Sequence, residues 1–145
     1  MTTTLPVTTL DETIHKTQIW LKDLTNRTGF RDEEEAFKAI RAVLHSVRDR
    51  ITINEAAHLG AQLPILLRGV YYEGWRPTDT PKTTRDKEGF LEMVREELHR
   101  NAIQIDPEIA SSAVFRLLND HLSEGLQEDV KSMLPKEVRE LWEGA

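Results

Sequence analysis

Three glutamate–histidine pairs have a type and spacing that could support metal chemistry. Each pair has the pattern Glu-x-x-His, so on a helix both side chains would lie on the same face. The pairs are Glu12 and His15, Glu55 and His58, and Glu96 and His99. Dimetal sites in helical bundles take such a pair from each of two helices, together with two further glutamates. The same spacing also arises by chance on solvated faces of a chain with 25 acidic residues.

The segments that would position these pairs all have a helical pattern. Apolar residues recur at helical spacing in eight segments, and capping residues or prolines stand at their starts. Pro64 and Pro135 are placed as first-turn residues, and Asp32, Thr52 and Ser123 as N-caps. No segment alternates apolar and polar residues as a strand would, so an all-α fold is predicted.

The first helix has its own signals. Thr9 and Glu12 have the form of a capping box, and Gly29 is a suitable C-terminal stop. Its apolar face is expected to comprise Ile14, Gln18, Leu21 and Leu24, with Trp20 beside them.

An internal repeat organises the chain. A shift of 71 residues (135 − 64 = 71) aligns the two halves without a gap from residue 39 to residue 72. Identical pairs are Ala39/Ala110, Ala42/Ala113, Val43/Val114, Asp49/Asp120, Leu63/Leu134, Pro64/Pro135 and Arg68/Arg139. They fall at core, cap and helix-start positions, where a common fold would impose them. We predict two pseudo-symmetric repeats of about four helices each, forming one compact helical bundle.

The repeat sets the expected domain organisation. Residues 1–8 form a flexible lead-in, and residues 9–145 form a single helical domain. Within it, repeat 1 covers 9–74, a linker covers 75–84 and repeat 2 covers 85–145. Asp49 with Arg68, and Asp120 with Arg139, are candidates for structural ion pairs that join two helices of each half.

The repeat also weakens the metal hypothesis. The positions that match Glu55 and His58 are Leu126 and Asp129, so a symmetric site is absent. Serines lack the setting of a known nucleophile, and there is no glycine-rich phosphate loop. We therefore predict no metal and no cofactor, and we leave enzymatic activity open while favouring a non-catalytic role.

Composition limits the partners and the compartment. The net charge is −6, which disfavours binding to nucleic acid phosphates. There is no cysteine, and no apolar run approaches the length of a membrane span. The N-terminus lacks the features of a signal peptide. A cytoplasmic protein that binds neither nucleic acid nor membrane is predicted.

The stretch from Gln62 to Pro77 contains the strongest candidate contact surface. Tyr, Trp and Arg are the residues that carry most energy in protein interfaces. The candidate surface comprises Arg68, Tyr71, Tyr72, Glu73, Trp75 and Arg76. In the second half, Gly69 and Tyr72 are replaced by Glu140 and Glu143, so this surface is specific to the first half. Alternatively, Trp75 and one tyrosine fold back under the 76–84 loop and pack within the molecule.

The block from Arg41 to Pro77, R-A-V-L-H-S-V-R-D-R-I-T-I-N-E-A-A-H-L-G-A-Q-L-P-I-L-L-R-G-V-Y-Y-E-G-W-R-P, resembles the bacterial family called domain of unknown function 2267 (DUF2267). The resemblance extends to the helix at Phe90 and Leu91 and to the closing L-P-x-x-x-R-x-L-W of residues 134–142, so it covers roughly residues 12–143. It implies a small, all-helical bacterial protein and brings no assigned catalytic residues.

These observations favour a non-catalytic protein-binding or homo-oligomerisation module. The alternative is a small-molecule or metal-dependent enzyme that uses the cleft between the two repeats.

Overall fold

A computed structural model describes residues 6–27, 30–82 and 86–145, and every regular element within these ranges is a helix. The α-helices are α1 (Thr8–Arg27), α2 (Glu33–Arg48), α3 (Ile53–Ala61), α4 (Ile65–Tyr72), α5 (Lys87–Arg100), α6 (Pro107–His121), α7 (Glu124–Met133) and α8 (Lys136–Glu143). A short 3-10 helix, η1 (Pro77–Asp79), lies in the predicted linker. The all-α prediction is confirmed. The predicted stop at Gly29, residues 1–5 of the predicted lead-in and residues 83–84 of the predicted linker lie outside the described residues.

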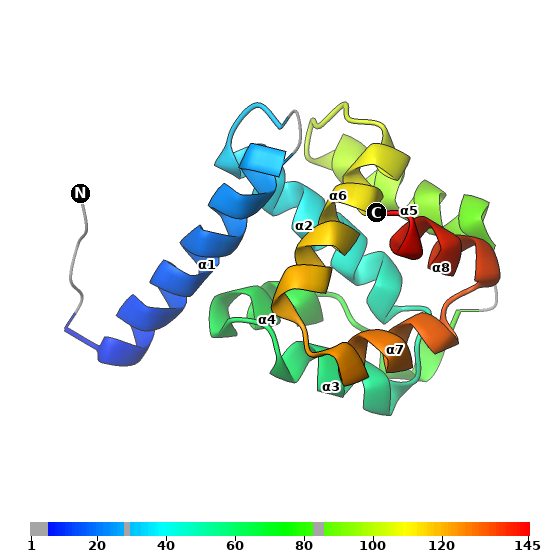
Figure 1. Ribbon diagram of the computed structural model, residues 1–145, viewed down its shortest axis with the longest axis horizontal. Coiled ribbons are helices and arrows are strands. Elements are labelled where there is room, and N and C mark those ends of the chain that lie inside the picture. The colour runs from blue at the N-terminus through cyan, green and yellow to red at the C-terminus, as the bar shows by residue number, and fades with distance from the viewer. Residues whose placement is uncertain (1–5, 28–29, 83–85) are drawn as a thin grey trace.

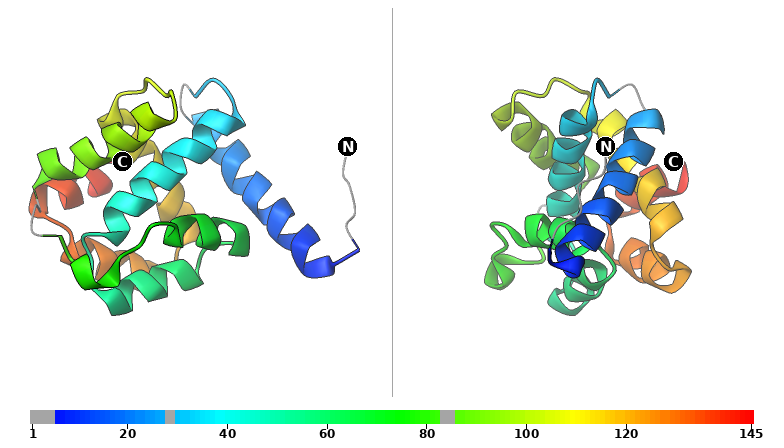
Figure 2. Two further views of the ribbon diagram at one scale, coloured as in Figure 1. Left: turned by 180° about the vertical axis from the view of Figure 1, so that it is seen from behind. Right: turned by 90° about the vertical axis from the view of Figure 1, so that its left-hand side faces the viewer.

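Helix α2 lies at the centre of the bundle (Figure 1). Ten of its sixteen residues are buried, and it packs against α1, α4, α5 and α6. Every α-helix contributes apolar side chains to one shared core, which suits the burial that a chain of this length needs. The turned views in Figure 2 place α5 along α2 and α1 at one edge of the bundle.

Local capping explains where most helices begin. The side chains of Asp32, Thr52, Asp106 and Ser123 each accept a hydrogen bond from a backbone N–H of the first turn. These bonds satisfy amides that have no partner within the helix. The predicted capping box at Thr9 and Glu12 is wrong. Helix α1 begins at Thr8, so Thr9 lies inside the helix, and the carbonyl of Val7 accepts the first bonds.

The two halves correspond at the predicted shift. Helices α3 and α7 begin at residues 53 and 124 (53 + 71 = 124), and α4 and α8 begin at residues 65 and 136 (65 + 71 = 136). One contact between the halves is reciprocal. Gln62 bonds Ser123 through both its amide nitrogen and its amide oxygen, at 2.9 Å each, and its counterpart Met133 meets Thr52, the counterpart of Ser123, at 3.6 Å. Such reciprocity is typical of a two-fold arrangement. It supports the duplication, which stays a prediction.

The buried face of α1 differs from the predicted face. Trp20 and Leu24 are buried as expected, but Ile14 and Gln18 are exposed. Thr13 and Thr17 are buried instead, because both hydroxyls have hydrogen-bond partners within the protein. The hydroxyl of Thr17 donates to the carbonyl of Thr13 at 2.7 Å, and the hydroxyl oxygen of Thr13 accepts from the N–H of Leu66 at 3.0 Å. The result is an apolar stripe on α1 that the core does not cover.

Candidate functional site

The prediction that Tyr71 is part of a contact surface is wrong, because its ring lies fully inside the core. Its hydroxyl donates to the carbonyl of Ala56 on α3 at 2.7 Å. Burial raises the pKa of Tyr71 well above its usual range, and the nearby Tyr72 adds to this, while Arg48 opposes it. Tyr71 therefore acts as a clamp between α4 and α3.

Tyr72 and Trp75 are half-buried and pack within the molecule rather than forming an open patch. The ring centroids of Tyr71 and Tyr72 lie 4.9 Å apart, and those of Tyr72 and Trp75 lie 5.3 Å apart. Tyr72 also covers Gly60, where a Cβ atom would lie only 2.5 Å from the tyrosine hydroxyl oxygen. The small residue at position 60 is what allows α4 to lie this close to α3. Of the six predicted surface residues, Glu73 and Arg76 are exposed.

Arg68 closes the end of a helix instead of pairing with Asp49. It donates to the carbonyls of Gly60, Ala61 and Leu63 at 2.8–3.2 Å, and these groups lie at the C-terminus of α3, where helix carbonyls lack partners. Arg139 donates to the carbonyl of Lys131 in the same way, at 3.1 Å. Residues 60 and 131 are again 71 apart.

The predicted ion pair between Asp49 and Arg68 is therefore wrong. Asp49 instead accepts from Nε of its neighbour Arg48 at 2.9 Å. In the second half, Asp120 is exposed at the end of α6. Each arginine lies one turn into its helix and reaches back to carbonyls of the preceding helix.

The Glu-x-x-His pairs lie apart on separate helices. His58 Nδ1 meets Glu55 Oε2 at 2.8 Å, and the histidine side chain is mostly exposed. Glu12 and His15 are exposed on α1, and Glu96 and His99 are exposed on α5. Among the residues that the structure describes, no group of three or more His, Cys, Asp or Glu side chains is placed to hold a metal ion.

A polar cleft between α2, the end of α4 and α5 contains groups that the motif search missed. Its volume is about 520 Å³, and it lies between segments of the two predicted repeats. At its base, His45 Nδ1 lies 2.8 Å from Glu97 Oε1, and His45 Nε2 lies 2.8 Å from the carbonyl oxygen of Val70. Beside them, the buried Arg48 donates from Nη1 to two carbonyls at the end of α4, at 2.7 and 2.8 Å.

The hydrogen bonds of His45 fix the orientation of its ring. A carbonyl oxygen can only accept, so Nε2 of His45 donates to Val70. Nδ1 faces Oε1 of Glu97, so both ring nitrogens have a partner inside the molecule.

The sequence held a weak signal for this pair. His45 follows Leu44 on the buried side of α2, and Glu97 lies seven residues after Phe90, at the spacing of the apolar stripe of α5. A polar residue at a core-facing position must find a partner. The partner is 52 residues away in the chain, so local spacing could not identify it.

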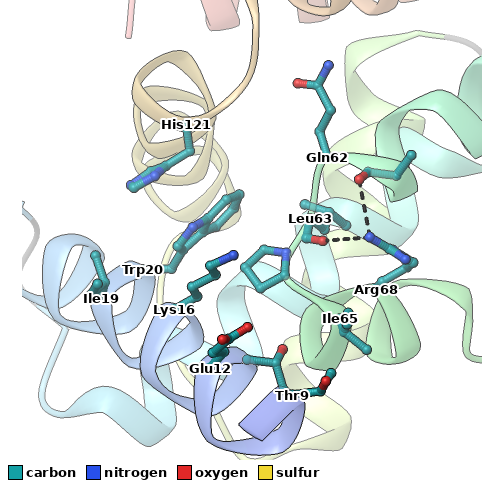
Figure 3. Close-up of a pocket in the computed structure, with 13 residues that line it drawn as sticks. Thr9, Glu12, Lys16, Ile19, Trp20, Gln62, Leu63, Ile65, Arg68 and His121 are labelled. Atoms are coloured by element: carbon teal, nitrogen blue, oxygen red, sulfur yellow. Dashed lines mark hydrogen bonds between the residues drawn. The ribbon is translucent and has the colours of Figure 1, made fainter.

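A second hollow of about 500 Å³ lies between α1 and the turn that joins α3 to α4. Figure 3 shows Glu12 and Lys16 on the α1 side of this hollow and Arg68 across from them, where it is held by its carbonyl bonds. At one end the ring of His121 stacks on Trp20, with centroids 4.5 Å apart, and His121 Nε2 meets Asp23 at 3.2 Å.

Comparison with known families assigns the chain to one of them. The family described as "Uncharacterized conserved protein (DUF2267)" matches residues 17–141, which is most of the chain. The chain belongs to the DUF2267 family. No curated protein matches this DUF2267 chain. In the described ranges, none of its helices combines the length and the apolar character that crossing a membrane requires.

Proposed function

We propose that this DUF2267 protein is a non-catalytic binding module that self-associates through one face of α1. The observation that carries the proposal is the uncovered apolar stripe of this helix. Val7, Leu10 and Ile14 follow at helical spacing, and their exposed fractions are 53%, 51% and 37%. Large apolar side chains gathered on one exposed face commonly mark an interaction site.

Exposed apolar side chains gather near this helix. Six of the eight exposed large apolar side chains in the described ranges belong to α1, the residue before it or the start of α4. Three of the six, Val7, Leu10 and Ile14, form the stripe, and we call these three residues the α1 surface.

The position of the stripe along α1 favours a second copy of the chain as the partner. When two α1 helices cross antiparallel about a two-fold axis near residue 10, Val7 of each copy lies opposite Ile14 of the other (7 + 14 = 21), and the two Leu10 side chains meet close to the axis. A two-fold interface needs such self-complementarity, because the same patch contributes to both sides.

An enzyme in the cleft between the repeats receives less support. Both ring nitrogens of His45 are already hydrogen-bonded, so this imidazole has no nitrogen available to bind a metal or to take up a substrate proton. The proposal includes a cytoplasmic location, which the absence of cysteine supports. It excludes nucleic acid as a partner, because the net charge of −6 disfavours binding to phosphates.

The test is the oligomeric state of a variant that carries Leu10→Glu and Ile14→Glu. Two carboxylates on the α1 surface should turn a dimer into a monomer, because burying unpaired charges in an apolar interface costs several kcal/mol. Both positions are exposed, so the fold should persist. Light scattering with sedimentation velocity measures the mass.

A matched control carries Ile53→Glu and Ile109→Glu, which place the same charges on exposed isoleucines outside the α1 surface. This control should stay dimeric. A wild-type protein that sediments as a monomer at high concentration, or a control that dissociates as readily as the Leu10 and Ile14 variant, would rule out the proposal.

A further inference from the structure

The polar cleft between α2 and α5 brings three arginines together. They are Arg41, Arg48 and Arg100, and the carboxylates of the lining are Asp49, Glu73 and Glu97. The formal charges of the lining cancel (3 − 3 = 0), in a chain whose net charge is −6, so the cleft is less acidic than the chain as a whole. Arg41 and Arg100 are held only loosely by these carboxylates, so a small anion is the ligand that suits the cleft.

Arg41 on α2 is the group best placed to hold that anion. Its guanidinium lies 3.5 Å from Glu73 and 3.6 Å from Glu97, and both distances exceed those of normal hydrogen bonds. Its Nε and Glu97 Oε2 are buried, and neither has a hydrogen-bond partner in the described residues. The Glu97 side chain is only 9% exposed, so this acceptor is costly to leave unsatisfied.

Arg100 on α5 gives the anion a second cation from the other wall. Its side chain is largely exposed, and its Nη2 lies 4.0 Å from Glu97, which is too far for a hydrogen bond. Two guanidinium groups that are paired only loosely, on facing helices, can turn toward an oxyanion and form charge-assisted bonds with it. Arg48 is bound to two carbonyls and Asp49, so it stays in the wall as a fixed charge.

We propose that this cleft binds a small oxyanion that also carries a hydroxyl group. When Arg41 turns to the anion, Oε2 of Glu97 loses its nearest cation and needs a donor. A hydroxyl next to the anionic group supplies that donor. This description fits an α-hydroxycarboxylate and the monoanion of phosphate, which share oxyanion acceptors and an O–H donor. The site is separate from the α1 surface, so it does not depend on self-association.

Calorimetric titration of the purified protein with glycolate, acetate and inorganic phosphate tests the proposal. Glycolate and acetate differ by one hydroxyl, so glycolate should bind about ten-fold more tightly, because its hydroxyl satisfies a buried carboxylate. Phosphate that binds more tightly than glycolate identifies a phosphate as the natural group, and the reverse order identifies a hydroxy acid. Equal affinities for glycolate and acetate overturn the role of the hydroxyl, and no saturable binding of any of the three overturns the site.

Variants place the binding in the cleft. Arg41→Met and, separately, Arg100→Met should each weaken glycolate binding about ten-fold or more, because each removes a charge-assisted contact. Arg95→Met is the matched control on α5, since Arg95 is half-exposed, pairs with Glu92 and lies outside this cleft. Thermal unfolding of each variant verifies its fold. Unchanged glycolate affinity in both Arg41→Met and Arg100→Met, or an equal loss in Arg95→Met, overturns the assignment.

Discussion

The buried hydroxyl group of Tyr71 makes the stability of the fold depend on pH. The folded chain keeps this phenol protonated, since burial raises its pKa far above the ordinary value of 10.0. In the unfolded chain the same phenol loses its proton once the pH passes 10. The unfolded state therefore binds fewer protons than the folded state at high pH, so stability is fully present below pH 10 and falls above it.

Tyr71→Phe should separate the two contributions of this hydroxyl. Near neutral pH the variant should be less stable by about 1 kcal/mol, because the bond to the carbonyl of Ala56 is lost. Above pH 10 the wild type should lose up to about 1.4 kcal/mol per pH unit through Tyr71, and the variant should lack this contribution. Urea unfolding between pH 7 and about pH 11 measures both. Parallel stability curves for the two proteins across this range would contradict the account.

At the scale of the elements, the approach of α4 to α3 depends on Gly60 and Tyr72. The tyrosine ring lies over the glycine, and a Cβ atom at residue 60 would come within 2.9 Å of the ring carbon Cζ. The same pair of helices is tied by the hydroxyl of Tyr71 and by the carbonyl bonds of Arg68. Three residues of the predicted contact surface, Arg68, Tyr71 and Tyr72, therefore hold two short helices together.

Gly60→Ala should destabilise the wild type by about 1–3 kcal/mol, because the ring of Tyr72 must move away from α3. In a Tyr72→Ala background the same change should cost less, because only the contact with Cε2 of Tyr71 at 3.1 Å remains and alanine favours a helix over glycine. Gly69→Ala is the control, because a Cβ atom there meets open space. Urea unfolding of the four combinations measures the coupling. A change at residue 60 that has the same effect in both backgrounds would refute the close packing.

At the scale of the whole molecule, the position of the apolar stripe on α1 limits how two copies can meet. Val7, Leu10 and Ile14 lie just before α1 or in its first half, so two copies bury the stripe against itself when their α1 helices cross near residue 10. In that arrangement Val7 of one copy lies opposite Ile14 of the other. The second half of α1, which includes Ile19, lies outside the proposed contact.

Val7→Glu should weaken the dimer about ten-fold or more, because it places a carboxylate against the apolar Ile14 of the other copy, twice per dimer. Ile19→Glu is the control on the same helix, since Ile19 is exposed but lies outside the stripe, and it should leave the dimer unchanged. Sedimentation equilibrium over a range of concentrations gives the dissociation constants. An Ile19→Glu variant that dissociates as readily as Val7→Glu would exclude this arrangement.

The sequence by itself determined the elements of this fold. Periodic apolar residues, N-caps such as Thr52 and Ser123, and the prolines at 64 and 135 predicted eight helices, because helix starts and stops depend on neighbours within a few residues. The 71-residue shift also anticipated the matching starts of α3 with α7 and of α4 with α8.

Only the tertiary structure decided which faces and partners those helices use. Thr13 and Thr17 could replace Ile14 and Gln18 inside the core because their hydroxyls found acceptors and donors nearby, which composition does not reveal. Arg68 met the carbonyls of the preceding helix, although Asp49 was the partner that charge alone suggested.

His45 and Glu97 show the same limit at longer range, since they meet across 52 residues and no local pattern links them. Pairing of this kind depends on how the helices pack, and packing is a property of the whole chain. The polar cleft and the uncovered stripe of α1 are therefore visible only in the folded molecule.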